Sequence, residues 1–492
     1  MEENAATESP IPLRTPPTGL AIFALVGPSM IWCAEYIGSG EVILSPRAGA
    51  ILGIGVLWAV VTTIFLKYWI GLSGARYTVC TGEGMVDMFD RVPGPRHWAV
   101  WIVLVVQFVA GALSIGALAI AAGSFVGNLV SHLIHIEPGS LGWIVKLCGW
   151  VVAFFALAIA WTGGFDILKI VMSVFVLMIV LGALYIAVHV FPSFSDLVQG
   201  FSFQVPEVPQ WAIEKGRNIT SNPWKEILPL MGWAAGGFAS QVWYTYWVIG
   251  ANYGVTEGRG YGKPADVAAL KTLSRSAAEK VKGWCRVVYS DATVALTIGI
   301  IVTCGFLIAG VGVLRPAELI PEQETAAVTL SQIFAKQWGT IGGVIYLLAG
   351  SAALISTLLG QLAGWPRLLA DCFRICIPPI ARRVPWKWQF RFFLILFFCT
   401  NMIIVYAMGK KPVSVIQLAA VLDGVLLTAL QAIWVAIGLY FVMPRILSKD
   451  AYAVLKPSWI FAPILVVAAV VFGYLCVIQI PPVIMQLFKG VS

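Results

Sequence analysis

Residues 27–49 read GPSMIWCAEYIGSGEVILSPRAG. The segment begins as an apolar helix, is interrupted at Gly38-Ser39-Gly40 and Glu41, and continues as a shorter apolar run. Glycines on both sides of a serine weaken a helix, because glycine loses the most backbone freedom on becoming helical. A carboxylate there is costly inside a membrane, and unwound backbone must be buried in protein or line a watery cavity. The interruption therefore predicts a functional site at a broken helix.

The composition of the chain is that of a polytopic membrane protein. It has 492 residues, of which 59% are hydrophobic and 11% are charged, and its mean hydropathy is +0.87. The net charge of +8 does not indicate nucleic-acid binding, because the basic residues gather in short loops, where they set membrane topology. Nine cysteines are scattered without a Cys-x-x-Cys pair or a Cys/His zinc spacing, so we expect no structural metal and no cofactor.

The hydropathy pattern predicts eleven membrane spans, since about 20 apolar residues are needed to cross a bilayer. The spans are expected near residues 19–53, 54–76, 97–131, 141–162, 164–192, 224–252, 287–314, 339–366, 388–409, 412–443 and 458–483. Lysines and arginines gather after the second, sixth and eighth spans and are absent from residues 132–140. This pattern places the N-terminus in the cytosol. With an odd number of spans, the C-terminus is expected on the other side, and the plasma membrane is the expected location.

A second interrupted span follows five spans after the first. Its residues 234–241 read AAGGFASQ within an otherwise apolar, aromatic run. Paired interruptions five spans apart indicate a transporter built from an inverted repeat, whose substrate lies between the two breaks. The alternative is that Gly236 and Gly237 only let two helices pack closely. The expected divisions are a cytosolic tail (1–18), a first repeat (19–192), an extracytoplasmic loop (193–223), a second repeat (224–443) and a C-terminal helix (444–492).

Several further motifs resemble those of the Nramp family of divalent-metal transporters. Residues 26–28 (VGP) resemble the opening of the family's first span, and residues 71–76 (GLSGAR) with 81–83 (TGE) resemble its second-span segment. Asp291 opens the seventh span as the family's aspartate does, and residues 349–364 contain AGS and GQLAG runs similar to those of its eighth span. The resemblance covers most of the chain. It implies an all-α membrane protein with the LeuT-type five-plus-five inverted repeat, about 11 transmembrane helices, and breaks in helices 1 and 6.

The chain departs from the family pattern where the family binds metal. The Asp and Asn of the family's first-span motif are Gly38 and Glu41 here, and the Met and His of its sixth-span motif are Phe238 and Ser240. The resemblance also implies backbone contacts to the substrate at two positions and a tenth-span residue beside it. The residues it assigns to the substrate site are Glu35, Gly38, Glu41, Ala235, Phe238, Ser240, Gln241 and Asp423. The third span has no acidic residue from 98 to 136, where the family keeps carboxylates for protons, so we expect little proton cotransport.

Two carboxylates are the expected metal ligands. Glu41 follows the first break directly, and Asp423 lies in the middle of the tenth span. Intramembrane carboxylates are rarely idle, so we predict that Glu41 binds the cation and that Asp423 binds or supports it. The alternative for Glu41 is a structural ion pair with Arg47 or another basic group.

Roles are also expected for the other polar residues of the spans, and three of these residues have two alternative roles. Glu35 either completes an oxygen-rich site or caps backbone donors freed by the break, and Ser240 and Gln241 either bind through oxygen or satisfy the second break. Lys67 is expected to extend its charge to the cytosolic surface. Asp291 is expected in an inner gate or at the membrane interface.

The ligand set decides the functional hypothesis. Carboxylate, amide, hydroxyl and backbone oxygens suit hard cations such as Mg²⁺ or Mn²⁺, so we predict a divalent-cation transporter working by alternating access in the lipid bilayer. The alternative is an organic or monovalent solute on the same fold, for which Arg47, Phe238 and Trp243 are easier to explain. A receptor that keeps the fold without transport is a third reading. No loop indicates a catalytic domain, so an enzyme is not expected.

Overall fold

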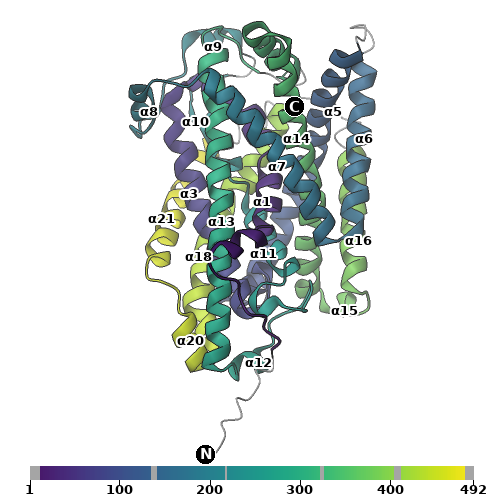
Figure 1. The fold of residues 1–492 in the computed structure, drawn as a ribbon, viewed down its shortest axis with the longest axis vertical. Coiled ribbons are helices and arrows are strands. Elements are labelled where there is room, and N and C mark those ends of the chain that lie inside the picture. Colours follow the sequence, from purple (N-terminus) through teal and green to yellow (C-terminus); the bar gives the residue numbers. More distant parts are fainter. Residues whose placement is uncertain (1–10, 135–140, 217–218, 322–325, 404–411, 483–492) are drawn as a thin grey trace, which may run out of the picture.

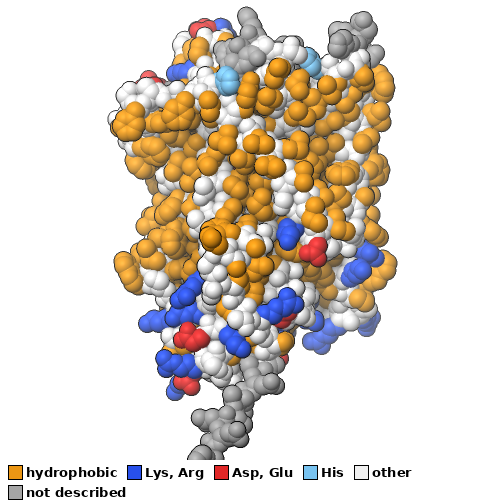
Figure 2. All heavy atoms as spheres, viewed as in Figure 1, with side chains coloured by type: hydrophobic (Ala, Val, Ile, Leu, Met, Phe, Trp, Pro, Cys, Tyr) orange, Lys and Arg blue, Asp and Glu red, His pale blue; other side chains and the backbone are white. Residues whose placement is uncertain are grey.

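The computed structural model describes residues 11–134, 141–216, 219–321, 326–403 and 412–482, and it places no strand in them. Most of the long helices run along the long axis of the molecule (Figure 1). Apolar side chains cover the middle of the face in Figure 2, and Lys and Arg gather at its lower end, where α12 and α20 lie in Figure 1. An apolar belt with a basic end is typical of an integral membrane protein.

The helices divide into long spans and short segments. Their bounds are α1 Pro28–Tyr36, α2 Ser45–Leu52, α3 Leu57–Thr81, α4 Met85–Asp90, α5 Trp98–Ile134, α6 Leu141–Thr162, α7 Phe165–His189, α8 Phe194–Gly200, α9 Gln210–Lys215, α10 Trp224–Trp233, α11 Phe238–Gly250, α12 Val267–Lys271, α13 Arg275–Ala309, α14 Ala326–Cys376, α15 Pro378–Ala381, α16 Trp386–Asn401, α17 Pro412–Val421, α18 Thr428–Ile437, α19 Met443–Ile446, α20 Lys449–Leu455 and α21 Phe461–Tyr474. A 3₁₀ helix, η1 (Gly19–Leu25), precedes α1.

Within the described residues, eight helices are long and apolar enough to cross a membrane. They are Ile54–Thr81, Trp98–Ile134, Gly142–Thr162, Phe165–His189, Arg275–Leu314, Gly339–Cys376, Gln417–Ile446 and Phe461–Pro482. The bent pair Gly19–Leu25 and Pro28–Tyr36, with an angle of 51°, would add a ninth. The predicted sixth span consists of two shorter helices, α10 and α11, and α16 has only 16 residues. The end of the predicted ninth span, 404–409, lies outside the described residues.

Both interruptions predicted from the sequence are breaks in helices. The first separates α1 from a π-helical turn, Gly40–Leu44, that leads into α2. The second separates α10 from α11, with Ala235 and Gly236 at positive φ angles of 57° and 72°. A turn of this kind cannot continue a helix, so the reading of Gly236-Gly237 as a packing device in an unbroken helix is wrong. Helix α1 contacts α7, α11, α13 and α14, and Figure 1 shows α1 and α11 in the middle of the bundle.

Glycines bring a third segment against the second break. A Cβ atom on Gly424 would lie 1.9 Å from the carbonyl oxygen of Gly232, and one on Gly237 would lie 1.7 Å from Oδ2 of Asp423. Only glycine permits such contacts. The π-helical turn Leu422–Leu426 therefore packs backbone to backbone on the end of α10, which places Asp423 beside the break.

Candidate functional site

A small enclosed cavity lies between the two breaks. Its volume is about 10 Å³, which is near the lower limit for one water molecule. Its lining residues are Glu35, Tyr36, Ser39, Gly40, Trp233, Gly236, Gly237, Ser240, Trp243, Thr357, Gln361 and Asp423. They come from both broken helices, from α14 and from the turn after α17. The cavity therefore occupies the position that the paired interruptions predict for a substrate.

Glu35 is one of two carboxylates in this lining. It lies in the last turn of α1 and is 2% exposed. The hydroxyl of Ser240 on α11 donates a hydrogen bond to Glu35 Oε1, and Trp32 Nε1 donates to the Ser240 oxygen at 3.1 Å. These two hydrogen bonds link the end of α1 to the start of α11 across the cavity.

Asp423 is the second carboxylate. Its Oδ1 accepts hydrogen bonds from Gln107 Nε2 at 2.8 Å and from the Ala239 backbone at 3.3 Å. Gln107 is oriented in turn by Trp365, whose Nε1 donates to Gln107 Oε1 at 2.8 Å. Gln107 lies on α5, the third span, and the sequence analysis noted only that this span lacks acidic residues. A polar residue in the middle of an apolar span was the signal that would have identified it.

Glu41 is not among the residues that line the cavity. Its Oε2 accepts a hydrogen bond from the backbone N–H of Gly38 at 2.9 Å, and the Thr303 hydroxyl is a polar neighbour of the same carboxylate. A glutamate that bonds back to an N–H three residues earlier is the acidic half of a capping box. Glu41 thus satisfies a donor freed by the first break, a role that the sequence analysis had considered for Glu35.

Arg47 is not the partner of Glu41, so this alternative is wrong. Its guanidinium donates instead to both carboxylate oxygens of Glu226 on α10, at 2.8 and 2.9 Å, and to the Pro321 carbonyl at 3.0 Å. Gln417 on α17 donates to the same carboxylate at 3.2 Å. Both charged side chains are about 5% exposed. The pair joins α2 to α10, which lies in the half of the molecule away from the basic end (Figure 1).

The other predicted residues make contacts within the protein near the two breaks. Gln241 Nε2 donates to the Ala235 carbonyl at 2.8 Å, so this oxygen is already occupied. Phe238 is fully buried and packs on Phe89, with ring centroids 5.7 Å apart. Gly38 lies under Thr357, where a Cβ atom would come within 2.2 Å of the hydroxyl oxygen. Of the eight predicted residues, the cavity lining thus includes Glu35, Ser240 and Asp423.

Lys67 does not extend to the cytosolic surface, and that prediction is wrong. The side chain is fully buried. Its Nζ donates hydrogen bonds to the carbonyls of Met231, Gly232 and Gly236 at 2.9, 2.6 and 2.6 Å. These carbonyls are free because α10 ends there, and they attract the ammonium group more strongly than a distant surface does. Asp291 accepts hydrogen bonds from Gly27 N and Ser29 N at the start of α1, and its place in a gate or at the membrane interface stays a prediction.

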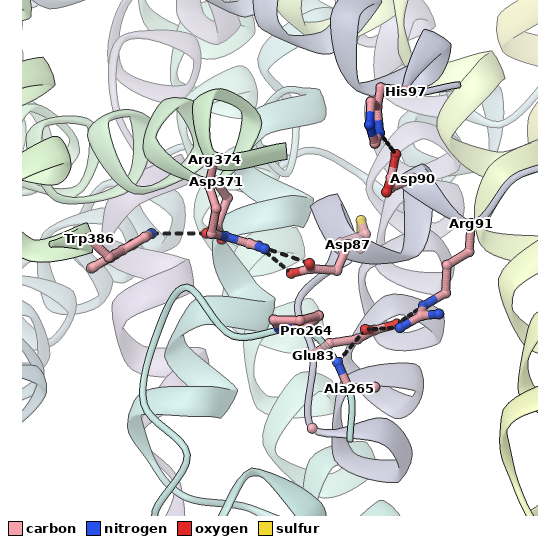
Figure 3. A network of polar contacts seen from close by, with 12 residues as sticks. Glu83, Asp87, Asp90, Arg91, His97, Pro264, Ala265, Asp371, Arg374 and Trp386 are labelled. Carbon is pink, nitrogen blue, oxygen red and sulfur yellow. Dashed lines mark hydrogen bonds and ion pairs between the residues drawn. The ribbon is translucent and has the colours of Figure 1, made fainter. Parts of the chain in front are cut away.

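A second polar network closes the basic end of the bundle (Figure 3). Arg91 donates to both carboxylate oxygens of Glu83 at 2.6 and 2.8 Å, and the backbone of Ala265 donates to Glu83 at 2.6 Å. Arg374 on α14 donates to both oxygens of Asp87 on α4 at 2.8 and 2.9 Å. Burial lowers the pKa of Arg91, but Glu83, Tyr77 and Asp87 together raise it by more, so the pKa is raised overall. The network ties α4 to α14 and to the loop before α12.

The chemistry of the cavity is that of oxygen ligands. Two carboxylates, the Ser39 and Ser240 hydroxyls and the Gln361 amide face it. In the described part of the chain, no three His, Cys, Asp or Glu residues come together as a metal-binding group. The arrangement therefore lacks the nitrogen and sulfur ligands that favour softer transition metals, and it leaves several coordination positions to water or to backbone.

Comparisons with known proteins agree with this architecture. The sequence model of the family described as natural resistance-associated macrophage protein-like, Nramp, matches residues 29–214. A divalent metal cation transporter MntH of Erwinia tasmaniensis is 35% identical over 81 residues, which are 16% of this chain and 20% of that protein. The MntH of Burkholderia ambifaria is 25% identical over 119 residues, 24% of this chain and 25% of that protein. The matched stretches thus span about a fifth and a quarter of these relatives.

Solved structures show the fold. A variant of the Eremococcus coleocola manganese transporter has a TM-score of 0.61 at 14% identity, covering 98% of this chain and 95% of that chain. MhsT in complex with L-phenylalanine has a TM-score of 0.57 at 13% identity, covering 97% of this chain and 100% of that chain. The fold is therefore the LeuT-type inverted repeat with helices 1 and 6 broken, as the sequence predicted.

Proposed function

We propose that the chain is a divergent member of the Nramp family, and that it is a secondary transporter that moves a divalent metal cation across the membrane by alternating access. One observation carries the proposal: Glu35 and Asp423 face the same enclosed cavity between the two broken helices. Two carboxylates at the centre of a membrane protein are costly unless a cation or proton offsets their charge.

The size of the cavity supports an ion as substrate. A volume of about 10 Å³ is enough for about one water-sized particle. The ligands supplied are oxygens, which suit Mg²⁺ or Mn²⁺, and Mg²⁺ usually keeps several of its waters when protein carboxylates bind it. In a cavity of this size the ion has little room for its own waters, so we favour a hard divalent ion that exchanges most of its hydration shell for Glu35, Asp423, Ser240 and Gln361.

Closure on both sides supports alternating access. The Arg47–Glu226 pair joins α2 to α10 on one side. On the other side, the Asp87–Arg374 pair joins α4 to α14, and the Glu83–Arg91 pair joins the two ends of α4. Opening either group alone would expose the cavity to one side of the membrane. We propose that residues 19–192 and 224–443 are the two repeats that move, that the basic end is cytosolic, and that the protein lies in the plasma membrane.

The aromatic lining favours a second candidate, a small organic cation. Tyr36, Trp233 and Trp243 line the cavity together with the two carboxylates. Aromatic faces attract alkylammonium groups, and opening of the bundle would enlarge the cavity. This alternative keeps Glu35 and Asp423 in the same charge-balancing role.

Uptake into proteoliposomes tests both candidates. Vesicles containing the full chain and a metal-sensitive dye should take up Mn²⁺ or Mg²⁺ in a saturable way, and the double variant Glu35→Gln/Asp423→Asn should not. A matched double variant, Glu214→Gln/Asp450→Asn, removes two exposed carboxylates that do not line the cavity and should behave like the wild type. Uptake of radiolabelled methylamine without metal uptake would replace the first candidate by the second. Internal acidification that follows metal uptake would contradict the expectation of little proton cotransport.

A further inference from the structure

The sixth helix contains a carbonyl site that is already filled by a cation of the chain itself. The ammonium group of Lys67 has three N–H donors, and each has one carbonyl acceptor: Met231, Gly232 and Gly236. An ammonium group has three donors and no acceptor, so the set is complete. Lys67 reaches this site from α3, which packs against α10 and α11.

The carbonyls of this site have the character of a cation site. Met231 and Gly232 lie in the last turn of α10, whose carbonyls have no partner in the helix and form the negative end of its dipole. Gly236 adds an unwound carbonyl from the break itself. In transporters with broken helices, such carbonyls and helix ends coordinate the coupling cation. The three carbonyls would attract a free monovalent cation if the ammonium were absent.

The surrounding charges also favour a cation at this position. Glu41 and Asp423 both interact electrostatically with Lys67, but no carboxylate lies within the 4.0 Å of an ion pair in the part of the chain that the structure describes. The ring of Phe472 on α21 lies 5.9 Å from the Nζ atom. The ammonium is thus held by neutral carbonyls and balanced by two carboxylates at longer range. One of these, Asp423, also lines the substrate cavity.

We propose that the Lys67 ammonium is a tethered cation that takes the place of a mobile monovalent cation at the break of helix 6. Because the charge is covalently attached, it is present at the carbonyl site in every transport cycle and is never released. It holds the end of α10 to the start of α11 and lowers the cost of the Asp423 charge beside the cavity. The consequence for transport, which rests on the proposed function, is that uptake needs no Na⁺ or K⁺.

The experiment empties the site and refills it from solution. Lys67→Ala removes the whole side chain and leaves room for a small cation beside the three carbonyls. The melting temperature of the purified full chain is measured in detergent by tryptophan fluorescence, with methylammonium, ammonium, Na⁺ or choline chloride at equal ionic strength. We expect Lys67→Ala to melt below the wild type, and methylammonium or ammonium to raise its melting temperature in a saturable way. Choline, which is too large, should have no such effect.

Two control variants separate cation binding from a general effect of salt. Lys67→Met keeps the length of the side chain and puts a methyl group at the carbonyls, so it should be destabilised without any response to methylammonium. Lys169→Ala removes a lysine of α7 that packs near Gly27, at the start of α1 and not at the break, and it should respond like the wild type. An equal response of Lys67→Ala to methylammonium and choline would overturn the proposal.

A variant that aggregates still gives an answer. If Lys67→Ala is recovered only as aggregate, methylammonium present during solubilisation should restore a monodisperse size-exclusion peak, and choline should not. Aggregation in both salts would count against the proposal.

Transport provides an independent readout. Replacing Na⁺ and K⁺ by choline should leave wild-type uptake unchanged, and uptake by Lys67→Ala should become several-fold dependent on ammonium or another small cation. A wild-type protein that needs Na⁺ would overturn the inference about coupling. If no metal is taken up at all, the proposed function fails, and the melting experiment still decides whether the carbonyl site binds a cation.

Discussion

The two broken helices satisfy their freed backbone groups in different ways. At the first break, each of three backbone groups has its own side-chain hydrogen-bond partner. Glu41 accepts from Gly38 N at 2.9 Å, the Ser356 hydroxyl donates to the Ala34 carbonyl at 2.7 Å, and the Thr357 hydroxyl donates to the Ile37 carbonyl at 3.1 Å. Each of these bonds contributes about 1 kcal/mol and can be exchanged separately.

At the second break, one charged group serves three carbonyls at once. Lys67 binds Met231, Gly232 and Gly236, Gln241 binds Ala235, and Gln431 donates to the Phe238 carbonyl at 3.0 Å. Loss of the Lys67 ammonium would leave three carbonyl acceptors without a donor at the same time. The difference suggests that the first break is the one that bends during transport and that the second is a fixed support.

The largest expected effect is therefore that of Lys67→Met. The change leaves three buried carbonyls without their donor, at about 1–3 kcal/mol each, so the free energy of unfolding should fall by at least about 3 kcal/mol. Thermal melting of the purified protein measures this loss. Lys271→Met removes an exposed lysine of α12 and serves as the control with the smaller effect. Equal melting temperatures of Lys67→Met and wild type would remove the distinction between the two breaks.

The next effect concerns the ion pair that joins the outer halves of both broken helices. Arg47→Met or Glu226→Gln alone leaves one buried charge without its partner, which costs about 3 kcal/mol or more. The double variant should lose less than the sum of the single losses, because neither charge remains. A double-mutant cycle of melting temperatures gives this coupling. Strict additivity would mean that the two side chains do not act as a pair.

Much of the fold followed from the sequence because hydropathy and helix breakers act locally. The glycines at 38, 40, 236 and 237 report directly on backbone freedom, and an apolar length of about 20 residues reports on a span. The departures occurred where the local pattern is ambiguous. Arg275–Leu314 forms one continuous helix, although the seventh span was expected to begin only near residue 287.

The site was predicted less completely because side-chain direction depends on distant partners. Lys67 lies 14 residues before the end of α3, about 21 Å along the helix, too far for its side chain to reach the cytosolic surface. That distance was the available signal. Its carbonyl partners, however, lie 164 to 169 residues later. For Glu41, the sequence placed the carboxylate at the break, but whether it faces the cavity or caps Gly38 is decided by one rotamer.

The third prediction compares how strongly three buried carboxylates contribute to cation affinity. Because Glu35 and Asp423 line the cavity and Glu41 does not, we expect Glu35→Gln and Asp423→Asn each to weaken Mn²⁺ binding by roughly tenfold, about 1.4 kcal/mol. Glu41→Gln keeps an oxygen that accepts from Gly38 N, so it should weaken binding by less than about threefold. Calorimetric titration of the folded variants measures these affinities. A larger effect of Glu41→Gln than of Asp423→Asn would restore Glu41 as the main ligand predicted from the sequence.

The smallest effect tests the claim that the first break is held by separable bonds. Thr357→Val keeps the branched shape that packs on Gly38 and removes only the hydrogen bond to the Ile37 carbonyl, so stability should fall by about 1 kcal/mol. Ser356→Ala should cost a similar amount, and the double variant should lose the sum. Ser173→Ala is the control, because its hydroxyl bonds a carbonyl within α7 at 2.8 Å.

The two bonds act at carbonyls separated by three residues, on the same side of the break, so coupling between them would show as a deviation from additivity. Losses that add within about 0.5 kcal/mol would agree with a hinge whose bonds exchange one at a time. A double variant that loses several kcal/mol more than the sum would mean that the first break is as cooperative as the second, and the assignment of the moving helix would have to be reversed.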